Sequence, residues 1–297
     1  MQREITQEMA KDRLPRREAD ANKGSFGSVL AAAGSMAYRG AAALCTEGAL
    51  RAGAGLVYLA SVEPVVQMVL TRTPECCACG CRTAANGGIH PQDAGALRSW
   101  FDGKNTVLLA GPGLGESAAP VCNALLGKKA PWSAAVLDAD ALNALAAGKI
   151  KGPLPDQTVI TPHPGEAARL LDCTVGEVQA DREAAARRLA GMYHCIAVLK
   201  GRGTLIATPG GEVYHNPTGS AGLAKGGSGD ILAGLTAGLL AAGLKQGRTP
   251  EDAAVCAVWL HGAAADRCAK RRSMTAMLPG DLFEDPVSYT HLTMPTN

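Results

Sequence analysis

The residues best suited to chemistry lie in one glycine-rich stretch, AKGGSGD, which is followed by a run of small apolar residues. Gly226, Gly227 and Gly229 have no Cβ, so the backbone can adopt left-handed conformations and bring its N–H groups close to a ligand. Residues 231–244 contain no proline and consist mostly of Leu, Ala and Gly, which predicts a helix beginning near Gly229. The first N–H groups of a helix and its positive dipole end bind anions. We therefore expect Gly226, Gly227 and Ser228 to form a phosphate loop.

Asp230 stands in the first turn of this predicted helix. A carboxylate beside a bound phosphate repels it, so the residue is better explained by a proton that it removes, and we expect Asp230 to be a general base. The alternative is structural, because Asp in a first helical turn favours the helix dipole and glycines are common before helices. The motif alone leaves both interpretations open.

Length and composition favour a small-molecule partner. The chain has 297 residues, enough for one large α/β domain or two small ones. Its formal net charge of +2 and its scattered charged residues argue against a nucleic-acid partner. The N-terminus lacks the apolar segment of a signal peptide, and no apolar run reaches roughly 18 residues, so we expect a cytoplasmic protein without a membrane partner.

Ten cysteines are present, and in a long chain with a full core we expect reduced thiols rather than disulfides. Four of them form a cluster, ECCACGC, at Cys76, Cys77, Cys79 and Cys81. This spacing is tighter than that of structural zinc sites, which usually combine two separated Cys pairs. A variable surface loop is therefore the favoured interpretation, and a metal site is the alternative.

Apolar runs and helical patterns alternate along the chain. The predicted strands are 28–33, 56–60, 106–110, 134–137, 158–161 and 196–199, with a hairpin of 205–208 and 212–215. The predicted helices are 41–52, 64–70, 92–101, 120–127, 174–192, 231–244 and 250–270, with an irregular region at 74–91 and the start of a last helix at 278–283. This alternation predicts an α/β domain with a central, mostly parallel sheet and helices on both faces.

We place an N-terminal arm and short helix at 1–21 and the domain at 22–284. Residues 285–297 continue no periodic pattern and are expected to be a non-native or disordered tail.

Further polar and glycine-rich segments follow the predicted strands, where open α/β sheets bind ligands. They include GPGLG at 111–115 and KGRGT at 200–204, which could hold phosphate or ribose oxygens. Asp140 is either a site residue or a helix N-cap. His163 lies between two prolines with Glu166 three residues on, which favours a rigidly held site residue, the alternative being an imidazole that stabilises a turn.

Taken together, these segments resemble the NAD(P)H-hydrate dehydratase family, a branch of the ribokinase-like superfamily, over about residues 15–281. The resemblance is carried by segments that occur in the family's order: NKGSFG (22–27), GSMAYRGAA (34–42), GPGLG (111–115), LDADALN (137–143), TPHPGE (161–166), LKGRGT (199–204), NPTG (216–219) and AKGGSGD (224–230).

The resemblance implies a lyase that repairs nicotinamide nucleotides by dehydrating the S-epimer of NAD(P)H hydrate (NADHX and NADPHX) to NAD(P)H. It implies Mg2+ and ADP or ATP as co-substrate, with ADP favoured, a homotetramer, and an epimerase on a separate chain. The alternative is a small-molecule kinase of the hydroxymethylpyrimidine or thiazole type. Kinase relatives have Asn where this chain has His163, which favours the dehydratase.

The resemblance also assigns residues by matching positions. The hydrated nicotinamide nucleotide would contact Ala41, Gly113, His163 and Asp230. The adenine nucleotide would contact Lys200, Gly201, Arg202, Gly203, Thr204 and Gly229. Glu166 would serve the magnesium ion, and Asp230 would be the catalytic base.

Overall fold

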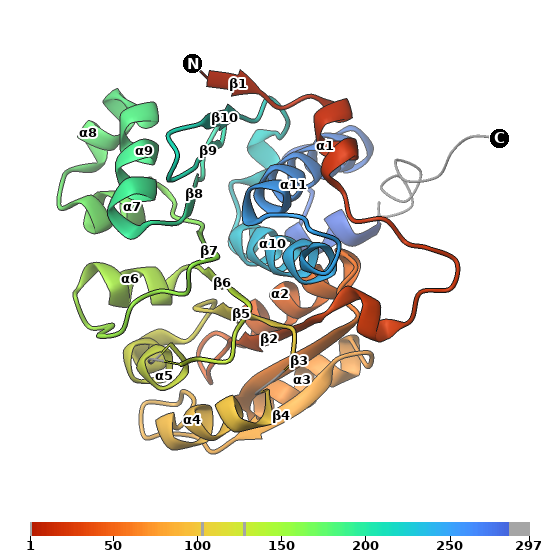
Figure 1. Ribbon diagram of the computed structural model, residues 1–297, viewed down its shortest axis with the longest axis vertical. Helices are drawn as coiled ribbons and strands as arrows, with labels where there is room; N and C mark the ends of the chain where they lie inside the picture. Colours follow the sequence, from red (N-terminus) through yellow and green to blue (C-terminus); the bar gives the residue numbers. More distant parts are fainter. Residues whose placement is uncertain (1, 102–103, 127–128, 285–297) are drawn as a thin grey trace.

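The computed structural model describes residues 2–101, 104–126 and 129–284, and shows a single ten-stranded sheet with helices packed on both faces (Figure 1). The strands are β1 (Gln2–Glu4), β2 (Ser28–Ala32), β3 (Leu56–Val62), β4 (Cys77–Cys81), β5 (Thr106–Ala110), β6 (Ala134–Leu137), β7 (Thr158–Ile160), β8 (Ile196–Leu199), β9 (Leu205–Ala207) and β10 (Val213–His215). Their order is β1-β10-β9-β8-β7-β6-β5-β2-β3-β4, and only β9 runs antiparallel to its neighbours. The predicted α/β class and mostly parallel sheet are therefore confirmed.

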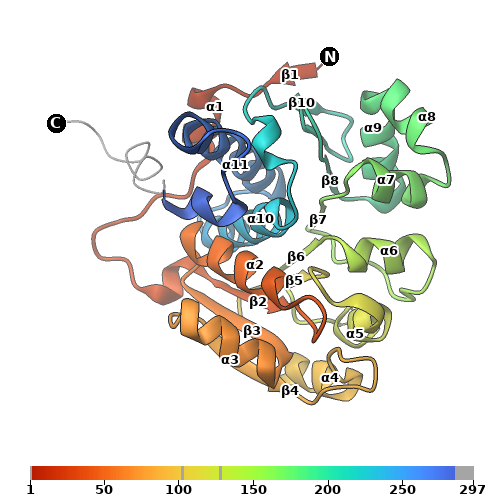
Figure 2. The same ribbon diagram turned by 180° about the vertical axis from the view of Figure 1, so that it is seen from behind.

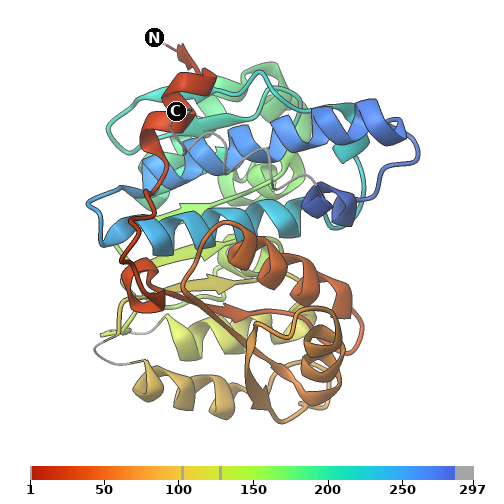
Figure 3. The same cartoon turned by 90° about the vertical axis from the view of Figure 1, so that its right-hand side faces the viewer.

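The central strands are apolar throughout because both of their faces are covered. Side chains alternate between faces, so Val29 and Ala31 of β2 enter one core while Leu30 and Ala32 enter the other. The first core lies under α1 (Gln7–Arg13), α2 (Arg39–Arg51), α3 (Glu63–Arg72), α10 (Ser228–Leu244) and α11 (Pro250–Arg272). The second lies under α4 (Pro91–Trp100), α5 (Ala118–Leu125), α6 (Asp140–Ala146), α7 (Pro164–Leu171), α8 (Val175–Ala180) and α9 (Arg182–Tyr193). Figures 2 and 3 show the two layers from behind and from the side.

Helix α10 is rich in glycine because it packs backbone to backbone against α2. A Cβ on Gly234 would collide with the Cys45 carbonyl group, and one on Gly238 would collide with the carbonyl group of Ala49. This close packing fixes where α10 begins, and therefore where the glycine-rich loop before it lies.

The strand order reverses direction at β2, which lies between β3 and β5. Ligands of open α/β sheets bind beyond the carboxyl ends of the strands at such a switch point. The loops that leave β2 and β5 meet there, where Gly34 N donates a hydrogen bond to Pro112 O at 2.8 Å. The fold thus brings the predicted segments 34–42 and 111–115 together.

Two of the predicted segments differ from the secondary structure observed. The region 74–91 is not wholly irregular, because Cys77–Cys81 forms the edge strand β4, paired in parallel with β3. The cysteine cluster is therefore mostly a strand rather than a loop, and all ten thiols are free. The predicted helix 174–192 is two helices that break at Asp181, whose carboxylate caps α9 by accepting a hydrogen bond from Ala184 N at 2.9 Å.

At the C-terminal end, the predicted start of a last helix is the 3-10 helix η4 (Pro279–Glu284), and the predicted tail 285–297 lies outside the described residues. At the other end, β1 joins the sheet beside β10. Among the described helices, none combines the length and the apolar character that crossing a membrane requires.

Candidate functional site

Most of the predicted site residues line one cavity of about 820 Å³ at the carboxyl ends of the central strands. It lies between the start of α10, the loop after β8 and the side of α11. Its lining includes His163, Glu166, Lys200, Gly201, Arg202, Gly203, Thr204, Gly226, Gly227, Ser228, Gly229 and Asp230. Residues far apart in the sequence are thus brought together as one site.

The glycine-rich loop presents the start of α10 to this cavity. Gly227 is the N-cap residue with a φ of 99°, a left-handed conformation that a residue with a Cβ rarely adopts. No side chain caps the helix. Its first turn therefore lacks the side-chain acceptor that many helices have, which suits an anion site.

A partly buried lysine and two buried carboxylates form the floor of the cavity. Lys200 Nζ donates a hydrogen bond to Asp138 Oδ1 at 2.7 Å and lies 3.9 Å from Glu166 Oε2. Asp138 Oδ1 also accepts a hydrogen bond from Thr161 Oγ1 at 2.8 Å. Burial lowers the pKa of Lys200, but the charges of Asp138 and Glu166 outweigh burial and raise it, so the ammonium group stays charged.

Asp230 has the electrostatic character of a general base. Burial, followed by the negative charge of Asp138, raises the pKa of Asp230 from 3.8 to about 6. Lys200 opposes this shift and Asp140 adds to it. A carboxylate that titrates close to neutral pH both ionises and accepts a proton readily, which is the property that a catalytic base needs.

His163 lines the cavity and also stabilises the turn before α7. Its Nδ1 accepts a hydrogen bond from Gly165 N at 3.0 Å, and Glu166 Oε2 accepts one from His163 N at 2.8 Å, which completes a capping box. The alternative left open by the sequence, a turn-stabilising imidazole, is thus part of what this ring does. Burial and then the charges of Lys200 and Arg169 lower the pKa of His163, so the ring is neutral.

Glu166 fits a magnesium ion only if the ion arrives with a phosphate. Mg2+ is commonly held by one or two carboxylates together with phosphate oxygens and water. Over the described ranges, no three His, Cys, Asp or Glu side chains are grouped to hold a metal without further ligands. Glu166 and Asp138 at the cavity floor can supply the one or two carboxylates, and the remaining ligands would come from a nucleotide.

Ala41 and Gly113 are not part of this cavity's lining but lie side by side where the loops after β2 and β5 meet. A Cβ on Gly113 would lie 2.9 Å from Ala41 Cβ and 2.7 Å from Tyr38 O. Asp140 connects these loops to the cavity, because its Oδ2 accepts a hydrogen bond from Gly115 N at 2.8 Å while its charge raises the pKa of Asp230. The N-cap interpretation of Asp140 was therefore wrong: α6 has Ala139 as N-cap and no side-chain cap.

Sequence reasoning missed two residues that shape the site. Asp138 follows directly after β6, a position that could have identified it, but only the fold pairs it with Lys200. Nothing in the sequence distinguished Arg182 from the other charged residues of its helix. Its Nη2 donates hydrogen bonds to the carbonyls of Leu199, Lys200 and Gly203 at 3.2 to 3.5 Å, and so holds the loop 200–204 in place.

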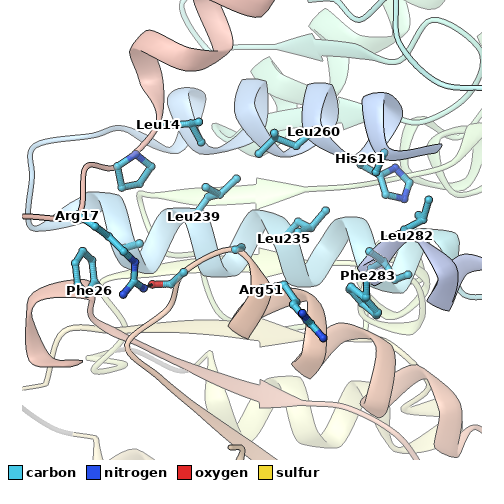
Figure 4. Close-up of a pocket in the computed structure, with 16 residues that line it drawn as sticks. Leu14, Arg17, Phe26, Arg51, Leu235, Leu239, Leu260, His261, Leu282 and Phe283 are labelled. Atoms are coloured by element: carbon cyan, nitrogen blue, oxygen red, sulfur yellow. Dashed lines mark hydrogen bonds between the residues drawn. The ribbon is translucent and has the colours of Figure 1, made fainter. Parts of the chain in front are cut away.

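A second cavity, of about 190 Å³, lies on the outer side of α10 between α2, α11 and η4 (Figure 4). Leucine side chains dominate its walls, and Arg17 and Arg51 lie at its edge. The described residues that line it include no carboxylate, so it lacks the acid–base groups of the first cavity.

Several known proteins are similar to this chain over most of its length. A bifunctional NAD(P)H-hydrate repair enzyme of Moorella thermoacetica is 41% identical over 288 residues, covering 94% of this chain and 52% of that relative. An ADP-dependent (S)-NAD(P)H-hydrate dehydratase of Neisseria meningitidis serogroup B is 37% identical, covering 90% of this chain and 86% of that relative. This chain thus spans about half the length of the bifunctional relatives that it matches.

A crystal structure of the ADP/ATP-dependent NAD(P)H-hydrate dehydratase of Bacillus subtilis, co-crystallised with ATP/Mg2+, matches with a TM-score of 0.82. The two sequences are 32% identical, and the match covers 98% of both chains. The sequence model described as NAD(P)H-hydrate dehydratase matches residues 29–286. With its ribokinase-like α/β fold, the chain therefore belongs to the NAD(P)H-hydrate dehydratase family.

Proposed function

We propose that this protein is a carbon–oxygen lyase that dehydrates the S-epimer of NAD(P)H hydrate to NAD(P)H at the expense of ADP or ATP. The observation that carries the proposal is the position and pKa of Asp230, a base titrating near neutral pH at the first turn of a helix that can bind phosphate. The family relatives whose names specify ADP favour ADP as the co-substrate.

The proposed reaction begins as phosphoryl transfer. Asp230 removes the proton of the ring hydroxyl, whose oxygen attacks the terminal phosphorus atom, and the bond from phosphorus to the shortened nucleotide breaks. The N–H groups at the start of α10 and the Lys200 ammonium stabilise the negative charge that develops. The lone pair of the ring nitrogen then expels the phosphate, and loss of the proton on the neighbouring carbon restores the dihydronicotinamide ring.

The remaining residue roles are proposed on the same basis. Ala41, Gly113 and His163 would contact the hydrated ring and its nucleotide, with Asp230 at the reacting hydroxyl. The loop 200–204 and Gly229 would hold the adenine nucleotide. A phosphate-bound Mg2+, held by Glu166 and Asp138, would supply positive charge to the transferred group.

Assembly and location are also proposals. The resemblance described under the sequence analysis implies a homotetramer that works in the cytoplasm and is supplied by a separate epimerase. Light scattering coupled to size-exclusion chromatography would test the tetramer, because a monomer or a dimer would contradict it.

A small-molecule kinase of the same fold is the second candidate, because one observation weakens the sequence argument against it. The sequence argued against a kinase because His163 replaces Asn, but here the ring caps α7, a task that Asn performs equally well. The presence of His163 therefore separates a dehydratase from a kinase less well than the sequence indicated. The two functions differ in the fate of the ester: a dehydratase expels its phosphate, whereas a kinase releases a stable phosphorylated alcohol.

The test is an assay of hydrated NADH with Mg2+ and either ADP or ATP, against a blank without nucleotide. Return of the near-ultraviolet absorbance of the reduced ring, matched by release of inorganic phosphate, is the expected result. If folded protein that binds nucleotide restores no absorbance with either co-substrate, the dehydratase proposal is wrong. A phosphorylated thiazole or pyrimidine alcohol formed by the same preparation would then establish the kinase.

A further inference from the structure

Unpaired polar atoms gather on one side of the large cavity. In the parts of the chain that the structure describes, seven buried side-chain nitrogen or oxygen atoms have no hydrogen-bond partner. Three of them belong to residues lining this cavity: Ser220 Oγ, Ser228 Oγ and His261 Nε2. A buried polar group without a partner is costly and uncommon in native proteins, so a cluster of them in a cavity indicates that a ligand completes their hydrogen bonds.

His261 is the least expected of the three, because it lies inside α11 rather than in a loop. It is only 8% exposed, and it belongs to the lining of both cavities. Figure 4 shows its ring beside Leu282 at one end of the apolar cavity. Leucine side chains offer no hydrogen bond, whereas the large cavity, which His261 also lines, has room for a ligand that does.

The ring of His261 is uncharged at physiological pH. Burial, and then the charge of Lys200, lower its pKa to about 4, although a hydrogen bond with the Ser228 backbone opposes the shift. A neutral imidazole carries one N–H donor, so a bound anion has to take this donor over from the Ser228 backbone. Such a donor can be buried next to Lys200 without adding a second positive charge, and it can still bind an anion.

We propose that His261 is a nucleotide-binding residue, whose Nε2–H group and the neighbouring Ser228 hydroxyl donate hydrogen bonds to a phosphate oxygen of the adenine nucleotide. The inference rests on the proposed function, which places nucleotide phosphates at the start of α10. We assign the contact to a phosphate rather than to the base or the ribose, because Ser228 is the first residue of that helix. Both atoms are enclosed in this structure, so the contact requires the two side chains to rotate toward the ligand.

Two substitutions separate this role from a structural one. His261→Met keeps a similar volume among apolar neighbours and removes the donor. His261→Gln replaces the ring with an amide whose N–H2 group can reach the position of Nε2. His90→Met is the matched control, because His90 Nδ1 is also buried and unpaired, but His90 is the N-cap residue of α4 on the other face of the sheet.

The measurement is titration calorimetry of the whole chain with ADP and Mg2+, without hydrate, together with thermal unfolding. For His261→Met we expect ADP binding that is roughly tenfold weaker or more. Its melting temperature should be unchanged or higher, because an unpaired polar atom has been removed from the interior. His261→Gln should recover most of the affinity, and His90→Met should bind ADP as the wild type does.

Two results would overturn the inference while the proposed function stands. One is wild-type ADP affinity in His261→Met. The other is a parallel fall of affinity and melting temperature that His261→Gln does not restore, which would make the ring a packing element. If the wild-type protein itself binds neither ADP nor ATP, the proposed function fails, and the role of His261 falls with it.

Discussion

Replacement of Asp230 by Asn should make the protein both more stable and nearly inactive. The substitution keeps the size of the side chain but removes its charge and its ability to take a proton. Burial and the charge of Asp138 raise the pKa of Asp230 from 3.8 to about 6. The ionised side chain is therefore less favourable in the folded protein than in the unfolded chain. A shift of this size corresponds to about 3 kcal/mol between the two protonation states.

The sign of the stability effect follows from proton linkage. Between the unfolded pKa of 3.8 and the folded pKa of about 6, the folded protein binds a proton that the unfolded chain has lost. The wild type therefore loses stability as the pH rises through this window, whereas the Asn variant has no group to titrate there. We expect the variant's advantage to grow from near zero at the acidic end to about 3 kcal/mol at neutral pH.

Urea unfolding across this pH window and steady-state turnover test the two halves of the prediction. Turnover should fall by roughly 100-fold or more, while ADP affinity should stay close to that of the wild type. In the wild type, kcat/KM should rise with pH through the titration near pH 6 as Asp230 becomes ionised.

Asp252→Asn is the control for Asp230→Asn, since Asp252 also stands in a first helical turn but completes the capping box of α11. It should lose stability and keep its activity. The reasoning would be refuted by an Asp230→Asn protein that is less stable at neutral pH, or that loses ADP binding in proportion to turnover. Either result would make Asp230 a structural residue.

Three further substitutions probe separate parts of the site. Lys200→Met leaves two buried carboxylates without their cation and should destabilise the protein by about 3–5 kcal/mol at neutral pH, with recovery on acidification, measured by urea unfolding. Arg182→Lys removes the forked contacts to the loop 200–204 and should raise the KM for nucleotide roughly tenfold without changing the KM for hydrate, in steady-state assays. Gly113→Ala places a Cβ 2.7 Å from Tyr38 O at a φ of 65°, and should do the reverse: a higher KM for hydrate with unchanged ADP affinity by calorimetry.

Local sequence patterns predicted most of the fold because the central strands are buried on both faces. Runs such as TVLLA and IAVL have no charged residue to interrupt them, so β5 and β8 were found with the correct ends. Strand β4 was missed because CACGC lacks β-branched and aromatic residues, and only pairing with β3 makes it a strand. The break at Asp181 was missed because charged periodicity continues across it.

The site was predictable where a residue follows a strand, and unpredictable where two residues must meet across the fold. Lys200 and Asp138 are 62 residues apart, and no local pattern pairs them. Sequence patterns also gave no indication for His261, which lies in a helix rich in apolar residues. Only the structure shows that its Nε2 is buried without a hydrogen-bond partner.

The charge of the cavity constrains how a nucleotide can bind. With all groups ionised, Asp230 and the two carboxylates beside Lys200 outnumber that lysine, so the floor of the cavity is negative. Other cations in the lining offset this little: Lys225 donates to two backbone carbonyls, and Arg202 is exposed to solvent. A nucleotide phosphate can therefore settle here only if positive charge arrives with it, or if Asp230 takes up a proton. Both conditions suit a reaction in which the nucleotide enters with its counter-ion and Asp230 becomes protonated as the phosphoryl group is transferred.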